Sequence, residues 1–176
     1  MYAEALRYFS ETFRLDSLHT RALLGAGEVL AVQGEPERAM AVYRKAISQS
    51  PSSAAGYRRL GELYLRVKDY AGAREIFSKT VVMEPGHAAD HYNLGVAHSR
   101  GHAYAAAVEH MQKAVSIEPE YDLAFYSLGD IYCAKLGNCV GAVELMEEAV
   151  RLKPERASYH VALGRIFMKL NRLEEA

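Results

Sequence analysis

The chain has 176 residues, of which 50% are hydrophobic and 24% are charged, and its formal net charge at pH 7 is -1. This amount of apolar material excludes a disordered chain, and the balanced charge argues against a nucleic-acid-binding protein, which needs a basic face. No apolar run approaches the roughly twenty residues of a membrane-spanning helix, so we expect no direct membrane insertion.

Helices are predicted along the whole chain, because bulky apolar residues recur at three- and four-residue spacing. The first of them carries Glu4, Arg7 and Glu11 at helical spacing and lacks the continuous apolar centre of a secretory signal. In chain order, the predicted helices cover residues 2–15, 20–33, 36–49, 54–67, 70–83, 88–100, 104–117, 122–136, 140–152 and 157–170.

Three columns of residues repeat with one period of 34 residues, interrupted by a single interval of 35 in each column. The glycine column is Gly27, Gly61, Gly95, Gly129 and Gly164. The alanine column is Ala5, Ala39, Ala73, Ala107, Ala142 and Ala176. The proline column is Pro51, Pro85, Pro119 and Pro154. A shared period in three columns indicates a tandem repeat of one structural unit.

Each column predicts a structural role within a pair of helices. The glycine lies among bulky residues of the first helix and lets the second helix approach closely. The alanine belongs to a stripe of small and large residues on the second helix, and the proline ends that helix because it cannot continue one. Gly34, Gly101, Gly137 and Asn171 lie between the two helices of a unit, where we expect a left-handed cap.

These columns resemble the signature of the tetratricopeptide repeat family. The second repeat carries most of that signature, as Tyr57, Leu60, Gly61, Tyr64, Ala73, Phe77 and Pro85. The resemblance implies an all-α fold, a right-handed α-α superhelix of helix-turn-helix units. The departures are minor, since no repeat has tryptophan at its first aromatic position and the fourth repeat carries one extra residue. We place that residue between the two helices, near Leu136 to Cys139.

We expect a single repeat array over residues 1–176. Residues 1–19 are the second helix of a preceding repeat, the full repeats are 20–53, 54–87, 88–121 and 122–156, and residues 157–176 are a partial repeat. Because the chain begins and stops inside a repeat, without a polar capping helix, we expect a piece of a longer protein.

Catalysis is not expected. The sequence lacks HExxH, a phosphate loop, a GxSxG elbow and a glycine fingerprint after a strand, so we predict no enzyme, no catalytic residues and no cofactor. His91 and His98 occupy buried aromatic positions of the third repeat, which favours packing over a metal site. Their burial predicts that this repeat loosens in mild acid.

The two cysteines, Cys133 and Cys139, match no common zinc spacing and make no disulfide framework. A reducing compartment such as the cytoplasm is therefore the default, although the compartment is not identified. Cys133 falls on the groove side and is a candidate reactive thiol. A redox pair with Cys139 is the less favoured alternative.

The resemblance implies that the first helices line a concave groove for a peptide or a partner helix. The groove residues that we carry over are Arg58, Glu62, Arg66, Tyr92, Asn93, Arg100, Tyr126 and Asp130. The last helix adds Arg165 and Lys169 at groove-facing positions. Since Tyr92 and Tyr126 occupy one column of adjacent repeats, we expect an aromatic step on the groove floor, in a peptide site centred on them, Arg58 and Asn93. In the alternative, Arg58 and Arg66 pair with Glu62 at four-residue spacing and the tyrosines cover backbone.

The predicted function is a protein-interaction scaffold or adaptor whose partner is a protein or peptide. Two alternatives stay open. The chain could self-assemble into homo-oligomers through uncapped repeat ends, or serve as the recruitment arm of an enzyme whose catalytic domain lies outside this segment. The carboxylate clamp of chaperone-binding family members is not expected, because Glu62 would repel the carboxylate.

Overall fold

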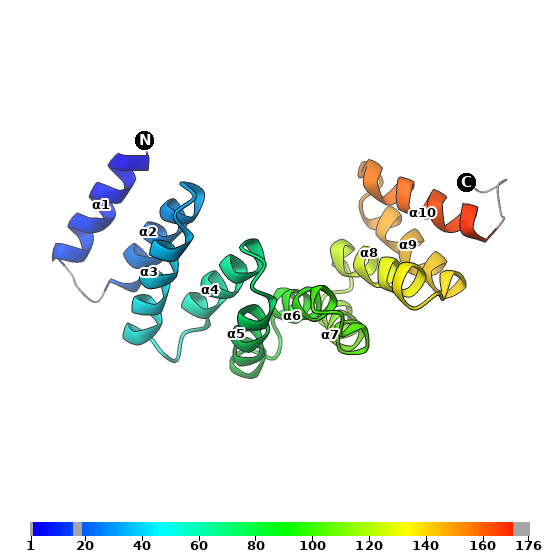
Figure 1. Ribbon diagram of the computed structural model, residues 1–176, viewed down its shortest axis with the longest axis horizontal. Coiled ribbons are helices and arrows are strands. Elements are labelled where there is room, and N and C mark those ends of the chain that lie inside the picture. The colour runs from blue at the N-terminus through cyan, green and yellow to red at the C-terminus, as the bar shows by residue number, and fades with distance from the viewer. Residues whose placement is uncertain (1, 16–18, 171–176) are drawn as a thin grey trace. The chain divides into compact units, whose positions relative to one another are not determined.

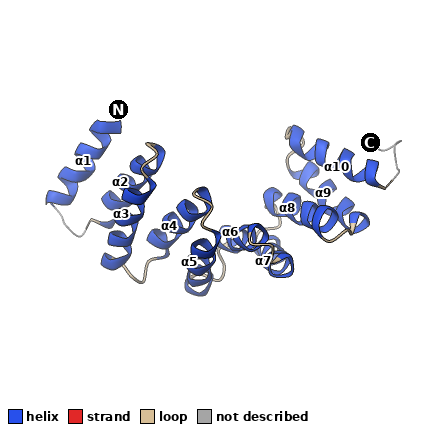
Figure 2. Ribbon diagram, viewed as in Figure 1, coloured by secondary structure: helices blue, strands red, loops and turns tan. Residues whose placement is uncertain are grey.

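A computed structural model describes residues 2–15 and 19–170, and the regular structure in that part of the chain is helical (Figure 2). The helices follow one another as α1 (Tyr2–Leu15), α2 (Thr20–Val32), α3 (Pro36–Gln49), α4 (Ala54–Arg66), α5 (Tyr70–Met83), α6 (Ala88–Arg100), α7 (Tyr104–Ile117), α8 (Asp122–Asp130), the π-helix η1 (Ile131–Lys135), α9 (Cys139–Leu152) and α10 (Ala157–Lys169) (Figure 1). The predicted helices are confirmed, with ends that differ by one residue at most.

The proline column ends the second helices as predicted. Helices α3, α5, α7 and α9 each stop two residues before a proline, at Pro51, Pro85, Pro119 and Pro154. The residue before a proline is disfavoured in the α-helical region, which explains this constant distance. None of the described helices has both the length and the apolar character needed to cross a membrane.

The helices form two compact units, Met1–Pro85 and Gly86–Ala176. In the first unit, helices that follow one another in the chain pack together, α2 on α3, α3 on α4 and α4 on α5. Its core lies between these helices and includes Leu30, Ala39, Tyr43, Leu60 and Ile76. Each helix buries one apolar face against its neighbours, as expected for helices that cannot form a core alone.

The glycine column marks the closest approach of the paired helices. A Cβ atom built on Gly27 would lie 2.4 Å from the ring of Tyr43, and one on Gly61 would lie 2.8 Å from the ring of Phe77. In the second unit, a Cβ atom built on Gly95 would lie 2.8 Å from the Cγ atom of Met111. The predicted role of the glycine column is therefore confirmed.

The second unit pairs α6 with α7 and α8 with α9, and α10 packs on α9. One part of its core contains Ala107, Met111, Leu128 and Ile131. Another part surrounds Met146, with the side chains of Cys133, Ala142, Val143, Ile166 and Phe167. The pairing follows the order of the chain, as in the first unit.

The turns inside the helix pairs differ in part from the prediction. Gly34 and Gly137 have positive φ values of 79° and 72°, as expected, but Gly101 has φ -89° and is the C-cap of α6. The left-handed residue there is His102 (φ 62°), and its counterpart in the second repeat is Lys68 (φ 64°). The left-handed position follows the C-cap residue, so the prediction for Gly101 was one residue too early. Asn171 lies outside the described residues.

The extra residue of the fourth repeat lies inside a helix. The left-handed residue follows the column glycine by seven residues in the first three repeats, and Gly137 follows Gly129 by eight. The added residue is taken up by the π-helix η1, where the N–H of Leu136 donates to the carbonyl of Ile131 over 3.0 Å. Our placement near Leu136 to Cys139 was wrong, because a π-turn absorbs one residue without breaking the helix.

Candidate protein-binding surface

The basic residues predicted for the groove in the first unit are engaged within the protein. Arg58 forms an ion pair with Glu84, and Arg66 Nη2 donates to the carbonyl of Ala31 over 2.8 Å. Glu62 instead accepts from Arg59, with 3.2 Å between Nη1 and Oε2. The alternative in which Arg58 and Arg66 pair with Glu62 is therefore wrong, because Glu84 and the carbonyl of Ala31 accept from them instead.

The two tyrosines predicted to form an aromatic step have separate partners. The ring of Tyr92 lies 5.2 Å from that of Tyr121, and its hydroxyl lies 3.4 Å from Ser127 Oγ. The ring of Tyr126 stacks on Tyr159, with 4.9 Å between centroids and 24° between planes. Each ring therefore has a partner of its own, and the step that Tyr92 and Tyr126 would form on the groove floor stays a prediction.

Tyr159, on which the ring of Tyr126 stacks, is only 1% exposed and is held by hydrogen bonds of its hydroxyl group. The Tyr159 hydroxyl donates to Asp122 Oδ2 over 2.5 Å and accepts from Arg156 Nη1 over 2.8 Å. Burial, together with the hydrogen bond to Asp122, raises the pKa of Tyr159 to about 12. The hydroxyl of Tyr159 is therefore neutral at ordinary pH. Its two hydrogen bonds hold the Tyr159 ring in place, and the ring of Tyr126 stacks on it.

The remaining predicted residues of the second unit present polar groups that the described part of the chain does not use. Arg100 and Asp130 are exposed and Asn93 is half-buried. No hydrogen bond or ion pair from another described residue engages these three side chains. They are the groups that an external ligand could meet, in contrast to the engaged arginines of the first unit.

A pocket of about 180 Å³ lies between two parts of the second unit, with α8 and η1 on one side and α10 on the other. We call it the α8–α10 pocket. Its apolar lining includes Met146, Ala162 and Ile166. Its charged lining consists of Asp130 from α8 and of Arg165 and Lys169 from α10. Tyr126 and Cys133 complete the wall on the α8 side. The sequence identified Tyr126 and Asp130 as groove residues, and the repeat register also places Arg165 and Lys169 at groove-facing positions of the last first helix.

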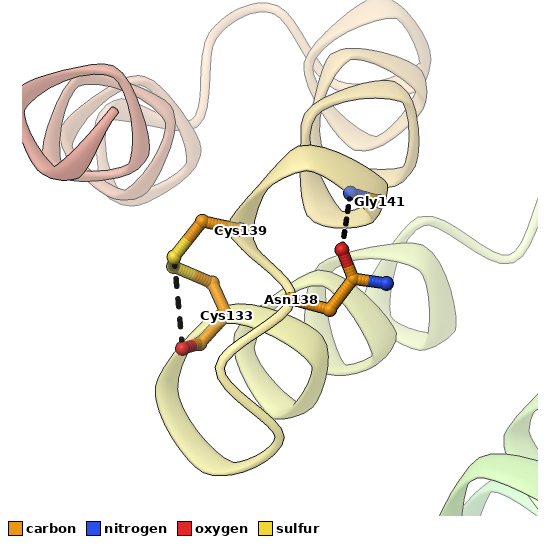
Figure 3. Close-up of a disulfide and its surroundings, with 4 residues drawn as sticks. All are labelled: Cys133, Asn138, Cys139 and Gly141. Carbon is orange, nitrogen blue, oxygen red and sulfur yellow. Dashed lines mark hydrogen bonds between the residues drawn. A yellow bond between two sulfur atoms is a disulfide. The ribbon is translucent and has the colours of Figure 1, made fainter. Parts of the chain in front are cut away.

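Cys133 and Cys139 form a disulfide between η1 and the start of α9 (Figure 3). Next to it, Asn138 caps α9, because its Oδ1 accepts from the N–H of Gly141 over 2.9 Å. The prediction of a reactive thiol at Cys133 is therefore wrong, and so is the argument for a reducing compartment, which assumed unpaired cysteines. The sequence raised the pairing of the two cysteines only as the less favoured alternative, because the bond depends on how the π-turn brings η1 to the next helix.

Three histidines of the α6–α7 pair lie against one another. The ring of His110 lies 5.8 Å from that of His91 and 5.5 Å from that of His98. No group of three or more histidine, cysteine or acidic side chains in the described part of the chain is arranged to hold a metal ion. Burial and the two neighbouring histidines lower the pKa of His110, and they outweigh the opposing effect of Glu109 on the same helix.

This lowered pKa makes the stability of the chain depend on pH. The unfolded chain binds a proton at His110 near its ordinary pKa of 6.5, and the folded chain binds it only at lower pH. The stabilisation is therefore complete above pH 6.5 and is lost as the pH falls toward the folded value. We expect a lower melting temperature at about pH 5.5 than at about pH 7.5, measured by circular dichroism.

The matched variant is His110→Leu, because leucine occupies the equivalent position of the fourth repeat, Leu145. We expect this variant to lose less melting temperature between the two pH values than the unchanged chain. An equal loss in both proteins would contradict a role for His110.

Tetratricopeptide repeat profiles match most of the chain. One such profile matches residues 2–54 and 134–176, a second matches 33–94 and a third matches 91–121. Among curated proteins, the chain is 36% identical over 69 residues to anaphase-promoting complex subunit 6 of Arabidopsis thaliana. That alignment covers 39% of this chain and 13% of the relative, so the chain spans a small part of that protein.

Solved structures share the fold. MamA 41-end from Desulfovibrio magneticus RS-1 superposes with a TM-score of 0.79 at 28% identity, over 89% of this chain and 88% of that chain. YrrB, described as a TPR protein with an unusual peptide-binding site, has a TM-score of 0.75 at 21% identity, over 95% and 86%. Cut9–Hcn1, an APC/C hetero-tetramer, has a TM-score of 0.78 at 22% identity, over 96% and 34%. These similarities confirm the predicted fold class, an all-α solenoid of tandem helix-turn-helix repeats.

Proposed function

Because the chain belongs to the tetratricopeptide repeat family, we propose that it is an interaction scaffold whose first helices bind an extended peptide or a helix of a partner protein. Proteins of this family are generally scaffolds without catalytic activity, and their stacked repeats present extended binding surfaces. The predicted array over residues 1–176 and its repeat boundaries form part of this proposal.

The observation that supports this proposal is a difference in how the predicted groove residues of the two units are engaged. In the first unit, the ion pair of Arg58 and the backbone contact of Arg66 use these two side chains internally. In the second unit, the side chains of Asn93, Arg100 and Asp130 have no partner among the described residues. Tyrosine and arginine are enriched among the residues that anchor binding partners. We therefore place the ligand on the first helices of the second unit, next to Tyr92 and Tyr126.

Two similar proteins support a protein or peptide as the ligand. YrrB is described as having a peptide-binding site, and Cut9 is part of a hetero-tetramer with Hcn1. Both share the fold of this chain at identities that do not carry over a particular partner. We therefore infer a protein or peptide ligand from the exposed groups of this chain and from the role of the family's repeats in protein binding.

The test compares two double variants that remove the same chemical groups from different helices. Asn93→Ala/Asp130→Ala removes an amide and a carboxylate from first helices, and Gln112→Ala/Glu144→Ala removes them from second helices. A partner is captured with the full-length protein, purified, and titrated against each variant by calorimetry. We expect the first-helix variant to bind about tenfold more weakly, since a truncated anchor typically costs more than about 1 kcal/mol.

The second-helix variant should bind as the unchanged protein does. Equal affinity of both variants, or a loss confined to the second-helix variant, would overturn the proposal. If light scattering showed only concentration-dependent growth of the chain itself, with no partner bound, self-assembly would replace it.

A further inference from the structure

The α8–α10 pocket combines an apolar floor with a charged rim. The floor contains Met146, which is 1% exposed, and Ile166, which is 4% exposed. Arg165 and Lys169 lie four residues apart on α10, and Asp130 faces the pocket from α8. The three charged side chains have no hydrogen bond or ion pair with another described residue. The pocket therefore offers an apolar floor beside a rim with a net positive charge.

The walls of the pocket are fixed before any ligand arrives. The ring of Tyr126 is held by stacking on the buried Tyr159, whose hydroxyl is bonded to Asp122. Cys133 on η1 also lines the pocket and is held by its disulfide to Cys139 (Figure 3). A site with ordered walls loses little conformational entropy on binding, which favours affinity for a small segment.

The size of the pocket limits what can enter it. An apolar cavity of about 150 Å³ accommodates a benzene molecule, so a pocket of about 180 Å³ accepts one apolar side chain of the size of leucine or phenylalanine. The two cations on α10 would attract a carboxylate that lies next to that side chain. Asp130 contributes a single opposing charge on the other wall.

We propose that the α8–α10 pocket binds a segment of a partner protein in which a leucine- or phenylalanine-sized side chain is flanked by an acidic residue. The apolar side chain enters between Met146 and Ile166, and the carboxylate bonds to Arg165 and Lys169. This inference rests on the proposed function, and it adds the chemistry of the partner and the roles of Arg165 and Lys169.

Phage display of random heptapeptides against the full-length protein tests the proposal. Three proteins are compared: the unchanged protein, the pocket variant Arg165→Glu/Lys169→Glu, and the control variant Lys113→Glu/Lys153→Glu. All four lysine and arginine residues are exposed, and both variants change the net charge by the same amount. The enriched peptides are then synthesised, and their affinities are measured by fluorescence anisotropy.

We expect the unchanged and control proteins to enrich peptides with an acidic residue next to a large apolar one. The pocket variant should bind these peptides about ten- to a hundredfold more weakly, as expected for the loss of hydrogen bonds between charged groups. Enriched peptides that bind the pocket variant with unchanged affinity would overturn the pocket proposal and leave the proposed function intact. Enrichment of basic peptides would also overturn it. If no peptide and no captured partner bound any of the three proteins, both proposals would fail.

Discussion

Replacing Phe77 by alanine is expected to lower the free energy of unfolding by about 3–5 kcal/mol. The side chain is fully buried, and its ring packs against the backbone of Gly61, where a Cβ atom would lie within 2.8 Å. Gly61 has no side chain that could fill the space left by the ring. The cost therefore contains both the lost burial of the ring and the cavity that remains. Guanidinium denaturation followed by circular dichroism measures the change.

The matched control is Val82→Ala on the same helix, because Val82 is 78% exposed. An exposed substitution away from special features changes stability by about 0.5 kcal/mol at most. A Phe77→Ala variant as stable as the Val82→Ala variant would contradict the proposed packing of α5 on α4.

Replacing Gly27 by alanine is expected to destabilise the chain by about 1–2 kcal/mol, against the usual trend. In an ordinary helix interior, a change from glycine to alanine stabilises by about 1 kcal/mol. Here the added methyl group would lie 2.4 Å from Tyr43 Cε1 and under 3.0 Å from two further ring atoms. Tyr43 is only 3% exposed, so its ring cannot swing into solvent and α2 must shift away from α3.

Gly86→Ala is the control for Gly27→Ala, because nothing lies within 4 Å of a Cβ atom built on Gly86. We expect it to be neutral or to stabilise by up to about 1 kcal/mol, through the reduced entropy of the unfolded chain. Both variants are compared by the midpoint of guanidinium denaturation. If Gly27→Ala were as stable as Gly86→Ala, the glycine column would not mark a close helix contact.

The repeating part of the structure was predictable from the sequence. The ends of the second helices and the contacts within a helix pair follow from column residues, such as Pro85 two residues after α5 and Gly61 opposite Phe77. Small, bulky and helix-breaking residues act locally or on the next helix, so their spacing along the chain carries the information. The period therefore predicts the helices and their pairing.

The individual contacts of the polar surface were not predictable. The partner of Arg58 is Glu84, which lies 26 residues away in the chain, and the partner of Tyr126 is Tyr159, which lies 33 residues away. Side chains of several repeats lie near each of these positions. Which of them forms the contact depends on distances in the folded structure, which the spacing of residues along the chain does not give. The same holds for the disulfide of Cys133, which depends on the single π-turn of the chain's described part.

The central claim is that a partner protein binds to the first helices of the second unit. Site-specific photo-cross-linking in the native host tests it most directly, with benzoylphenylalanine placed either at Asp130 on α8 or at Val140 on α9. Both positions are exposed, and they differ in being on a first and a second helix. We expect a covalent product with a partner protein from position 130 and none from position 140. A product from position 140 alone, or equal products from both, would contradict the claim.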